Sequence, residues 1–173
     1  MKSNDQKAAA ALAYVIPLLE SCGLAWVITG GFASYVYGAK RSLTDIDIDV
    51  DASKDDPRFQ KLMKGLADRT TQPLEHFVDQ NYDNYNFEAT IDGVVIDICP
   101  MAEMNVFNKK AETYEHFYKD GFPAHEVVRW NGMALPLLSK ELIIKNKEML
   151  AWQRESDLKD IESLKKLISE KSA

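Results

Sequence analysis

Residues 45–50, DIDIDV, alternate an acidic with an apolar side chain, which is the pattern of a β-strand buried on one face. Asp45, Asp47 and Asp49 would then share one face, with neighbours about 7 Å apart given a rise of ~3.3 Å per residue. Carboxylates held this close repel one another, so each raises the cost of ionising the next. The strand therefore needs either water or a cation on its acidic face.

The sequence of this strand alone does not distinguish a solvated acidic face from a cation-binding one. A solvated edge strand would use the charges against aggregation, whereas Mg²⁺ would bind one or two of the carboxylates together with substrate phosphates. Asp97, inside the otherwise apolar run VVIDICP, is the candidate for a third carboxylate from a neighbouring strand. Three converging carboxylates match two-metal phosphoryl transfer. A calcium-binding EF-hand loop is excluded, because Val50 stands where that loop requires glycine.

A glycine pair precedes the acidic strand, at the end of the apolar run VITGG. Gly30 and Gly31 would let backbone N–H groups approach a phosphate, and the start of the following helix adds a partial positive charge. A plain strand-to-helix turn is the alternative. The pair is neither a P-loop nor a dinucleotide fingerprint, because no GK[ST] follows it and G-x-G-x-x-G is absent.

The remaining patterns predict an α/β (α+β) fold, a mixed β-sheet flanked by helices with a C-terminal helical segment. Helical spacing covers residues 5–21, with Asp5 as the expected cap, and then residues 32–39, 56–69, 139–152 and 155–168. Strands are expected over residues 24–29 and 43–50, and Asp92-Gly93 and Asn131-Gly132 predict two hairpins. The chain is expected to form one domain over residues 1–173, in which residues 139–173 could be a helical subdomain.

Composition narrows the function classes. A net charge of −6 disfavours tight non-specific binding of nucleic acid, although a local basic patch stays open. Cys22 and Cys99 show no metal-site or disulfide spacing. The apolar run after Lys7 carries no signal-peptide cleavage site and follows helical spacing, so a cytoplasmic protein without a membrane segment is expected.

ITGG, followed after 13 residues by DID and later by Asp97, resembles the signature of the DNA polymerase β-like nucleotidyltransferase superfamily. The spacer selects Asp45 and Asp47 as the matching carboxylates. RSLTDIDIDV is further similar to the R-x-x-T-x-D-I-D form of small bacterial members, which include antibiotic-modifying and toxin-type transferases. Here Thr44 directly precedes Asp45, a departure that leaves the alignment of Arg41 and Thr44 open.

The C-terminal part also resembles these small members, in a lysine on one helix followed by an Arg-x-x-Asp segment that opens the next. The matching residues are Lys145, Arg154 and Asp157, with Lys147 as the alternative lysine. In the family this part helps to hold the nucleotide phosphates and shapes the acceptor pocket.

The resemblance implies transfer of a nucleoside monophosphate (NMP) from a nucleoside triphosphate (NTP), with ATP as the expected nucleotide, to an acceptor hydroxyl or phosphate. Asp45, Asp47 and Asp97 would bind Mg²⁺, and Asp97 could accept the acceptor's proton. Gly30 and Gly31 would hold the phosphates. The expected nucleotide-binding set also includes Arg41, Thr44, Lys145 and Asp157.

Of the possible acceptors of the NMP group, a small molecule is the one we expect. A toxin-type transferase that modifies tRNA or protein, paired with an antitoxin, and an inactive binding module remain open. His76, His116 and His125 lack metal spacing, and Trp152 is interpreted as a core or helix-packing residue. Acceptor, base preference and oligomeric state are not specified by the sequence.

Overall fold

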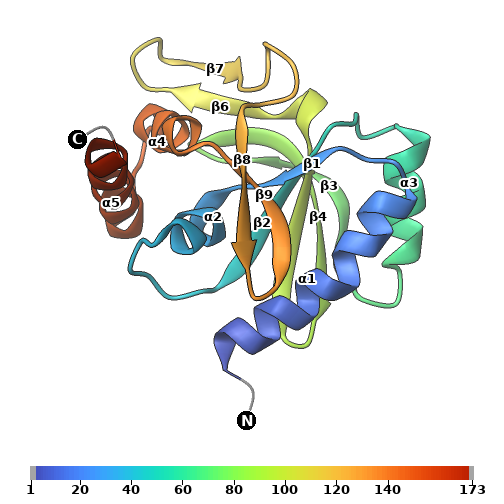
Figure 1. Ribbon diagram of the computed structural model, residues 1–173. Coiled ribbons are helices and arrows are strands. Elements are labelled where there is room, and N and C mark those ends of the chain that lie inside the picture. The colour runs from blue at the N-terminus through green and yellow to red at the C-terminus, as the bar shows by residue number, and fades with distance from the viewer. Residues whose placement is uncertain (1–2, 172–173) are drawn as a thin grey trace.

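The computed structural model describes residues 3–171, in which a mixed nine-stranded sheet is flanked by helices (Figure 1). The α-helices of this range are α1 (Asn4–Ser21), α2 (Gly30–Tyr37), α3 (Pro57–Gly65), α4 (Lys140–Met149) and α5 (Glu155–Lys171). A short 3₁₀ turn, η1, covers Met101–Glu103. The strands are β1 (Trp26–Ile28), β2 (Asp45–Val50), β3 (Thr70–Val78), β4 (Tyr82–Ile91), β5 (Val94–Pro100), β6 (Asn105–Asn108), β7 (Thr113–His116), β8 (His125–Trp130) and β9 (Met133–Leu138). The predicted mixed α/β architecture is confirmed.

The acidic strand β2 lies in the middle of the sheet rather than at an edge. The strand order is β7-β6-β4-β5-β2-β1-β9-β8, and β3 pairs with β4. β2 runs parallel to β5 and antiparallel to β1, and its register places Asp47 beside Asp97. Because β2 is paired on both sides, its acidic face cannot be explained as protection of an exposed edge.

The apolar faces of the central strands form the core. Ile46, Ile48 and Val50 are fully buried or nearly so, as are Ile96 and Ile98 of the neighbouring strand. Helix α1 packs over this face, against β4 and β5. The alternation of the sequence therefore separates a buried apolar face from an opposite, polar face of the same three strands.

The cap of α1 differs from the expectation. Ser3 is the N-cap, since its hydroxyl accepts a hydrogen bond from the Gln6 backbone N–H while the Gln6 side chain accepts one from the Ser3 N–H. This reciprocal pair satisfies two helix-end donors, which a cap by Asp5 would not do. Asp5 instead accepts a hydrogen bond of 2.9 Å from the Tyr35 hydroxyl.

Both predicted hairpin turns are confirmed. Asp92 and Gly93 have φ angles of 51° and 79°, and Asn131 and Gly132 have φ angles of 45° and 80°. Two successive positive φ angles give the turn whose twist suits an antiparallel pair. The first turn joins β4 to β5 and thereby sets which residues of the two strands face each other.

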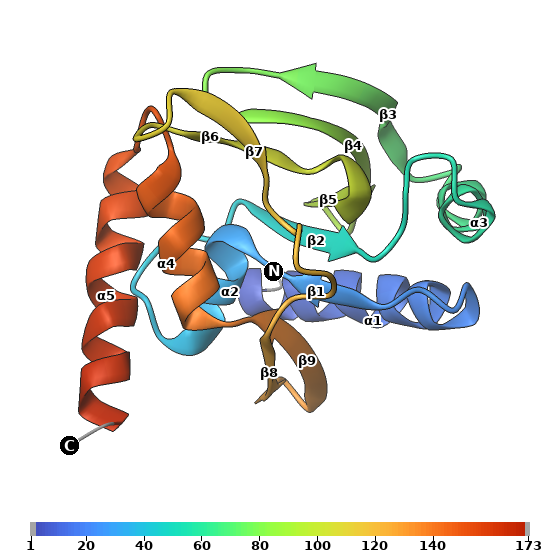
Figure 2. The same ribbon diagram turned by 90° about the horizontal axis from the view of Figure 1, so that it is seen from above.

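The C-terminal helices α4 and α5 pack against each other and against α2, at the end of the molecule opposite α3 (Figure 2). Ser139 caps α4 by accepting a hydrogen bond from the Leu142 N–H. The separate helical subdomain over residues 139–173 stays a prediction, and residues 172 and 173 lie outside the described range. Over residues 3–171, no helix has the length and apolar character needed to cross a membrane.

Candidate active site

The polar faces of β4, β5 and β2 form the floor of a cavity of about 410 Å³. Alternate residues of each strand point into it, because successive side chains of a strand point to opposite faces of the sheet. The floor residues are Tyr82, Asn84, Asn86 and Glu88 of β4, Asp97 and Cys99 of β5, and Asp45, Asp47 and Asp49 of β2. The two strands that carry the predicted carboxylates thus contribute to one site.

Carboxylates form a row across the three strands. Asp47 pairs in register with Asp97, and Asp97 pairs in register with Glu88 on its other side. The predicted convergence of acids from two neighbouring strands is therefore present in the backbone register. Glu88 extends it to a third strand.

The ionisation of these acids reflects their crowding. Burial, followed by the charges of Asp45 and Asp97, raises the pKa of Asp47 to about 8. Burial and the charge of Glu88 raise the pKa of Asp97 to about 6, against hydrogen bonds to its carboxylate from Asn86 and Cys99. Full ionisation of the floor is therefore disfavoured in the protein alone, and a bound cation would favour it.

The donor set fits a hard cation such as Mg²⁺, since carboxylate oxygens are its preferred protein ligands. Within residues 3–171, however, no group of three or more His, Cys, Asp or Glu residues is arranged to hold a metal ion by itself. Mg²⁺ commonly relies on one or two carboxylates and completes its shell with phosphates and water. The carboxylates thus fit a metal that binds together with a nucleotide better than a permanent metal centre.

The glycine pair lies against this floor. Gly30 has φ of +61° and begins α2, and the Thr29 N–H donates a 3.0 Å hydrogen bond to the Asp47 carbonyl. A Cβ atom on Gly30 would lie 1.9 Å from Asp47 Oδ2, and one on Gly31 would lie 2.3 Å from the Arg41 guanidinium carbon. Gly30 needs glycine because of its positive φ and the Asp47 carboxylate beside it, whereas a Cβ on Gly31 would have to displace the flexible end of the Arg41 side chain.

Gly30→Ala is expected to destabilise the protein by about 2 kcal/mol or more, because alanine is strained at positive φ and its methyl group would displace the Asp47 carboxylate. Thermal denaturation measures this effect. Gly121→Ala is the matched control, since Gly121 also has a positive φ, of 91°, but open space around it. Equal losses in both variants would show that backbone strain alone accounts for the requirement.

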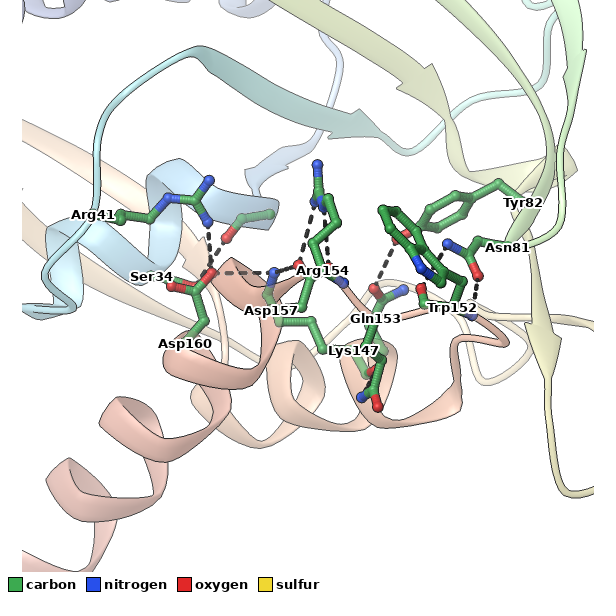
Figure 3. Close-up of polar contacts among 12 residues, drawn as sticks. Ser34, Arg41, Asn81, Tyr82, Lys147, Trp152, Gln153, Arg154, Asp157 and Asp160 are labelled. Carbon is green, nitrogen blue, oxygen red and sulfur yellow. Dashed lines mark hydrogen bonds and ion pairs between the residues drawn. The ribbon is translucent and has the colours of Figure 1, made fainter.

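Cationic side chains form the opposite wall, on the α2–β2 connection, on α4 and at the start of α5 (Figure 3). Lys147 Nζ lies 2.6 Å from Asp157 Oδ1 and 3.1 Å from Asp160 Oδ2. Arg41 Nη1 lies 2.6 Å from Asp160 Oδ2, and Arg154 Nε lies 3.1 Å from Asp157 Oδ2. Two buried aspartates of α5 thus hold three cations at the cavity.

The charge state of Asp157 follows from these partners. Its burial raises the pKa, but hydrogen bonds from Arg154 and Lys147 outweigh burial and bring the pKa down to about 2. Asp157 is therefore ionised at neutral pH. It bonds to Lys147 and Arg154 at the cavity, and its place in the nucleotide-binding set stays a prediction.

Most of the predicted residues meet in the one cavity. Its lining includes Gly30, Gly31, Arg41, Asp45, Asp47, Asp97 and Asp157. Of the two candidate lysines, Lys147 lines the cavity, whereas Lys145 is exposed with its Nζ 5.8 Å from the centroid of the Phe117 ring. Thr44 lies outside this lining and donates a 2.8 Å hydrogen bond to Asp45 Oδ1, so it orients a carboxylate.

Several lining residues were not found from the sequence. Glu88 carried a usable signal, because a two-residue turn at Asp92-Gly93 pairs it with Asp97. Tyr118, whose hydroxyl donates a hydrogen bond to the Asp49 carboxylate, also lines the cavity and has no local signal in the sequence. The interpretation of Trp152 as a packing residue is wrong, since the residue is 53% exposed and lines the cavity.

The arrangement of the chain is the nucleotidyltransferase fold, so the resemblance seen in the sequence is confirmed at the level of the fold. A protein from Thermotoga maritima described as a nucleotidyltransferase superimposes with a TM-score of 0.63 at 19% identity, over 94% of this chain and 93% of its own. The lincosamide adenylyltransferase LnuA, solved with lincomycin, has a TM-score of 0.55 at 21% identity, over 90% and 95%. ANT(2″)-Ia, solved with adenylyl-2″-tobramycin, has a TM-score of 0.59 at 17% identity, over 95% and 91%.

No protein-family profile and no curated protein sequence matches this chain. The similarity to the solved structures is therefore one of fold.

Proposed function

We propose that the protein is a Mg²⁺-dependent nucleotidyltransferase that moves the NMP group of an NTP, with ATP as the expected donor, to a hydroxyl of a small molecule. The observation that carries this proposal is the meeting of the glycine turn, the carboxylate row and the cationic wall in one cavity. The nucleotidyltransferase fold supports it, because glycines, carboxylates and cations suit the three parts of a metal–triphosphate complex.

The cationic wall and the glycine turn would bind the triphosphate. The backbone N–H groups at the start of α2 point toward the cavity end of the helix, where a phosphate is favoured. Lys147, Arg154 and Arg41 would offset the negative charge that develops on the departing pyrophosphate. Asp45, Asp47 and Asp97 would hold Mg²⁺, which when bound supplies charge stabilisation to the attacking and leaving oxygens.

Asp97 would handle the proton of the reaction. The acceptor oxygen forms a bond to the α-phosphorus, the bond from that phosphorus to the pyrophosphate oxygen breaks, and the hydroxyl proton passes to the Asp97 carboxylate. A carboxylate beside the attacking oxygen is placed for this role. In the metal-free protein, burial and the charge of Glu88 raise the pKa of Asp97 to about 6, and a bound cation would lower it again and favour the carboxylate.

A small acceptor is favoured over RNA by the charge of the cavity. Its lining contains seven acidic residues, Asp45, Asp47, Asp49, Asp79, Glu88, Asp97 and Asp157. Its basic residues are Arg41, Lys147 and Arg154. A polyanionic acceptor would be repelled by this balance, and a cavity of about 410 Å³ falls in the range of small-ligand sites. The drug-bound states of LnuA and ANT(2″)-Ia support the same reading.

ATP and Mg²⁺ together are expected to raise the melting temperature, because the ligand binds only the folded state. At about 100 times the dissociation constant the gain is ~2.7 kcal/mol. Thermal-shift measurements with ATP and Mg²⁺, each alone and combined, check this expectation. Labelled α-phosphate from ATP should then appear on members of a panel of hydroxyl-bearing acceptors with release of pyrophosphate.

Two results would contradict the proposal. Absence of any shift with all four NTPs and Mg²⁺ would indicate a fold without nucleotide binding. Label transferred to tRNA or to protein, and to no small molecule, would replace the small acceptor by a toxin-type reaction.

A further inference from the structure

The connection between α4 and α5 is fixed to its neighbours at the cavity rim (Figure 3). The Asn81 side chain donates a 3.0 Å hydrogen bond to the Trp152 carbonyl and accepts one of 3.0 Å from the Trp152 N–H. The Gln153 side-chain amide donates a 2.7 Å hydrogen bond to the Lys147 carbonyl. Asn81 is itself buried, so two hydrogen bonds to a buried side chain hold the backbone of this short connection at Trp152.

The Trp152 side chain is nevertheless largely uncovered. Its residue is 53% exposed although it lines the cavity, and Phe77 of β3, which lines the same cavity, is 41% exposed. Folding gains little from an indole left in water, so a fixed backbone that presents one at a cavity points to a ligand that covers it. An aromatic face of this kind suits a flat, aromatic ligand group.

The same connection presents a cation two residues further on. Arg154 lines the cavity, and its side chain is 59% exposed while bonded to Asp157. Lys147 lies on the preceding helix and is held by the same aspartate. A flat aromatic face beside two cations matches a ligand that carries an aromatic ring at one end and phosphates at the other.

We propose that the Trp152 indole stacks on the nucleobase of the bound NTP and makes the site prefer purine over pyrimidine nucleotides. This inference rests on the proposed nucleotide binding and assigns the base to the rim formed by Trp152 and Phe77. Stacking reads the area of a ring rather than its hydrogen-bonding edge. ATP and GTP should therefore bind similarly, and both should bind more tightly than CTP and UTP.

Equilibrium titration of Trp152→Ala and of the parent protein, in the presence of Mg²⁺, tests the assignment. Trp152→Ala should weaken ATP binding about 10-fold, since base–aromatic stacking has this order of effect, and should narrow the difference between ATP and UTP. Inorganic tripolyphosphate, which has no base, should bind both proteins equally. ATP, but not tripolyphosphate, should change the tryptophan fluorescence of the parent.

Two further variants separate stacking from a structural role. Trp152→Phe keeps an aromatic face and should retain most of the ATP affinity. Phe122→Ala removes an aromatic residue that is 39% exposed outside the cavity lining and should bind ATP as the parent does.

Unchanged ATP affinity in Trp152→Ala would overturn the assignment and would leave the acceptor ring as the partner of the indole. An equal loss of ATP and tripolyphosphate affinity in Trp152→Ala and Trp152→Phe would overturn it too, because it would show a displaced connection. Failure of the parent to bind both ATP and tripolyphosphate would instead refute the proposed function.

Discussion

Asp47→Asn is expected to reduce NMP transfer by about 10³-fold or more and, at the same time, to stabilise the protein in the absence of metal. In the proposed reaction, the loss of a carboxylate that holds Mg²⁺ removes several kcal/mol of charge stabilisation, and each ~1.4 kcal/mol is a factor of ten in rate. Stabilisation is expected because Asp47 lies in register with Asp97 and is crowded by Asp45. An asparagine of the same shape ends that repulsion.

The pH dependence of stability gives a separate test of the same variant. The pKa of Asp47 in the folded protein is raised from 3.8 to about 8. The folded state therefore holds this proton more tightly than the unfolded state, so stability is lost as the pH rises from about 4 to 8. Denaturant unfolding in a chelator should show the advantage of Asp47→Asn growing over this interval.

Asp120→Asn is the matched control, because Asp120 is exposed and lies outside the cavity lining. It should change neither transfer nor the pH dependence. NMP transfer by Asp47→Asn near the parental rate would contradict the assignment of Asp47 as a metal ligand. A loss of stability of this variant at pH 8 would show that the Asp47 side chain makes a structural contact.

Asp157→Ala is expected to destabilise the protein by about 2–3 kcal/mol, because the buried Lys147 ammonium loses its closest partner and keeps only Asp160, at 3.1 Å. The effect should shrink in acid. Asp157 has its pKa lowered to about 2, so its contribution is present above about pH 4 and is lost as the pH falls toward 2. Urea unfolding of the variant and of the parent at pH 7 and at pH 3 measures the loss of stability and its decrease in acid.

Two further variants distinguish the loss of the Lys147–Asp157 ion pair from a general effect of substitution in the first turn of α5. Glu155→Ala, in the same first turn of α5 but exposed, should have a small effect. The double variant Asp157→Leu/Lys147→Met should recover much of the stability, since an apolar pair replaces a buried ion pair well, but should still bind ATP poorly. Full recovery of ATP binding in this double variant would exclude Lys147 from the triphosphate site.

The parts of the fold that could be predicted carry local signals. The glycine turn, the DIDIDV strand and both hairpins follow from residues close together in the chain. Strand β3 could not be predicted from local signals, because it is mostly exposed, contains Pro73 and pairs with β4 through register shifts. β6 and β7 have four residues each, too few for alternation to stand out.

Residues of the site could be predicted where they lie on strands whose sequence alternates polar and apolar side chains. Asp45, Asp47 and Asp97 could be named from the sequence, but their register depends on the parallel pairing of β2 with β5, which no turn sets. Lys145 and Lys147 could not be distinguished from spacing alone. Residues two apart on a helix face different sides, and the aspartates that bury Lys147 come from α5. Trp152 looked like a packing residue because exposure is set by neighbours distant in sequence.

The ion pair between Arg41 and Asp160 joins positions 119 residues apart in the chain. During synthesis the glycine turn and the acidic strand emerge from the ribosome long before α5. The carboxylates of β2 and β5 are therefore synthesised before Asp157 and Asp160, the aspartates of α5 that bind Lys147, Arg154 and Arg41. Lys147, Arg154 and Arg41 are therefore aligned at the cavity only after α5 has been synthesised and has packed against α2 and α4.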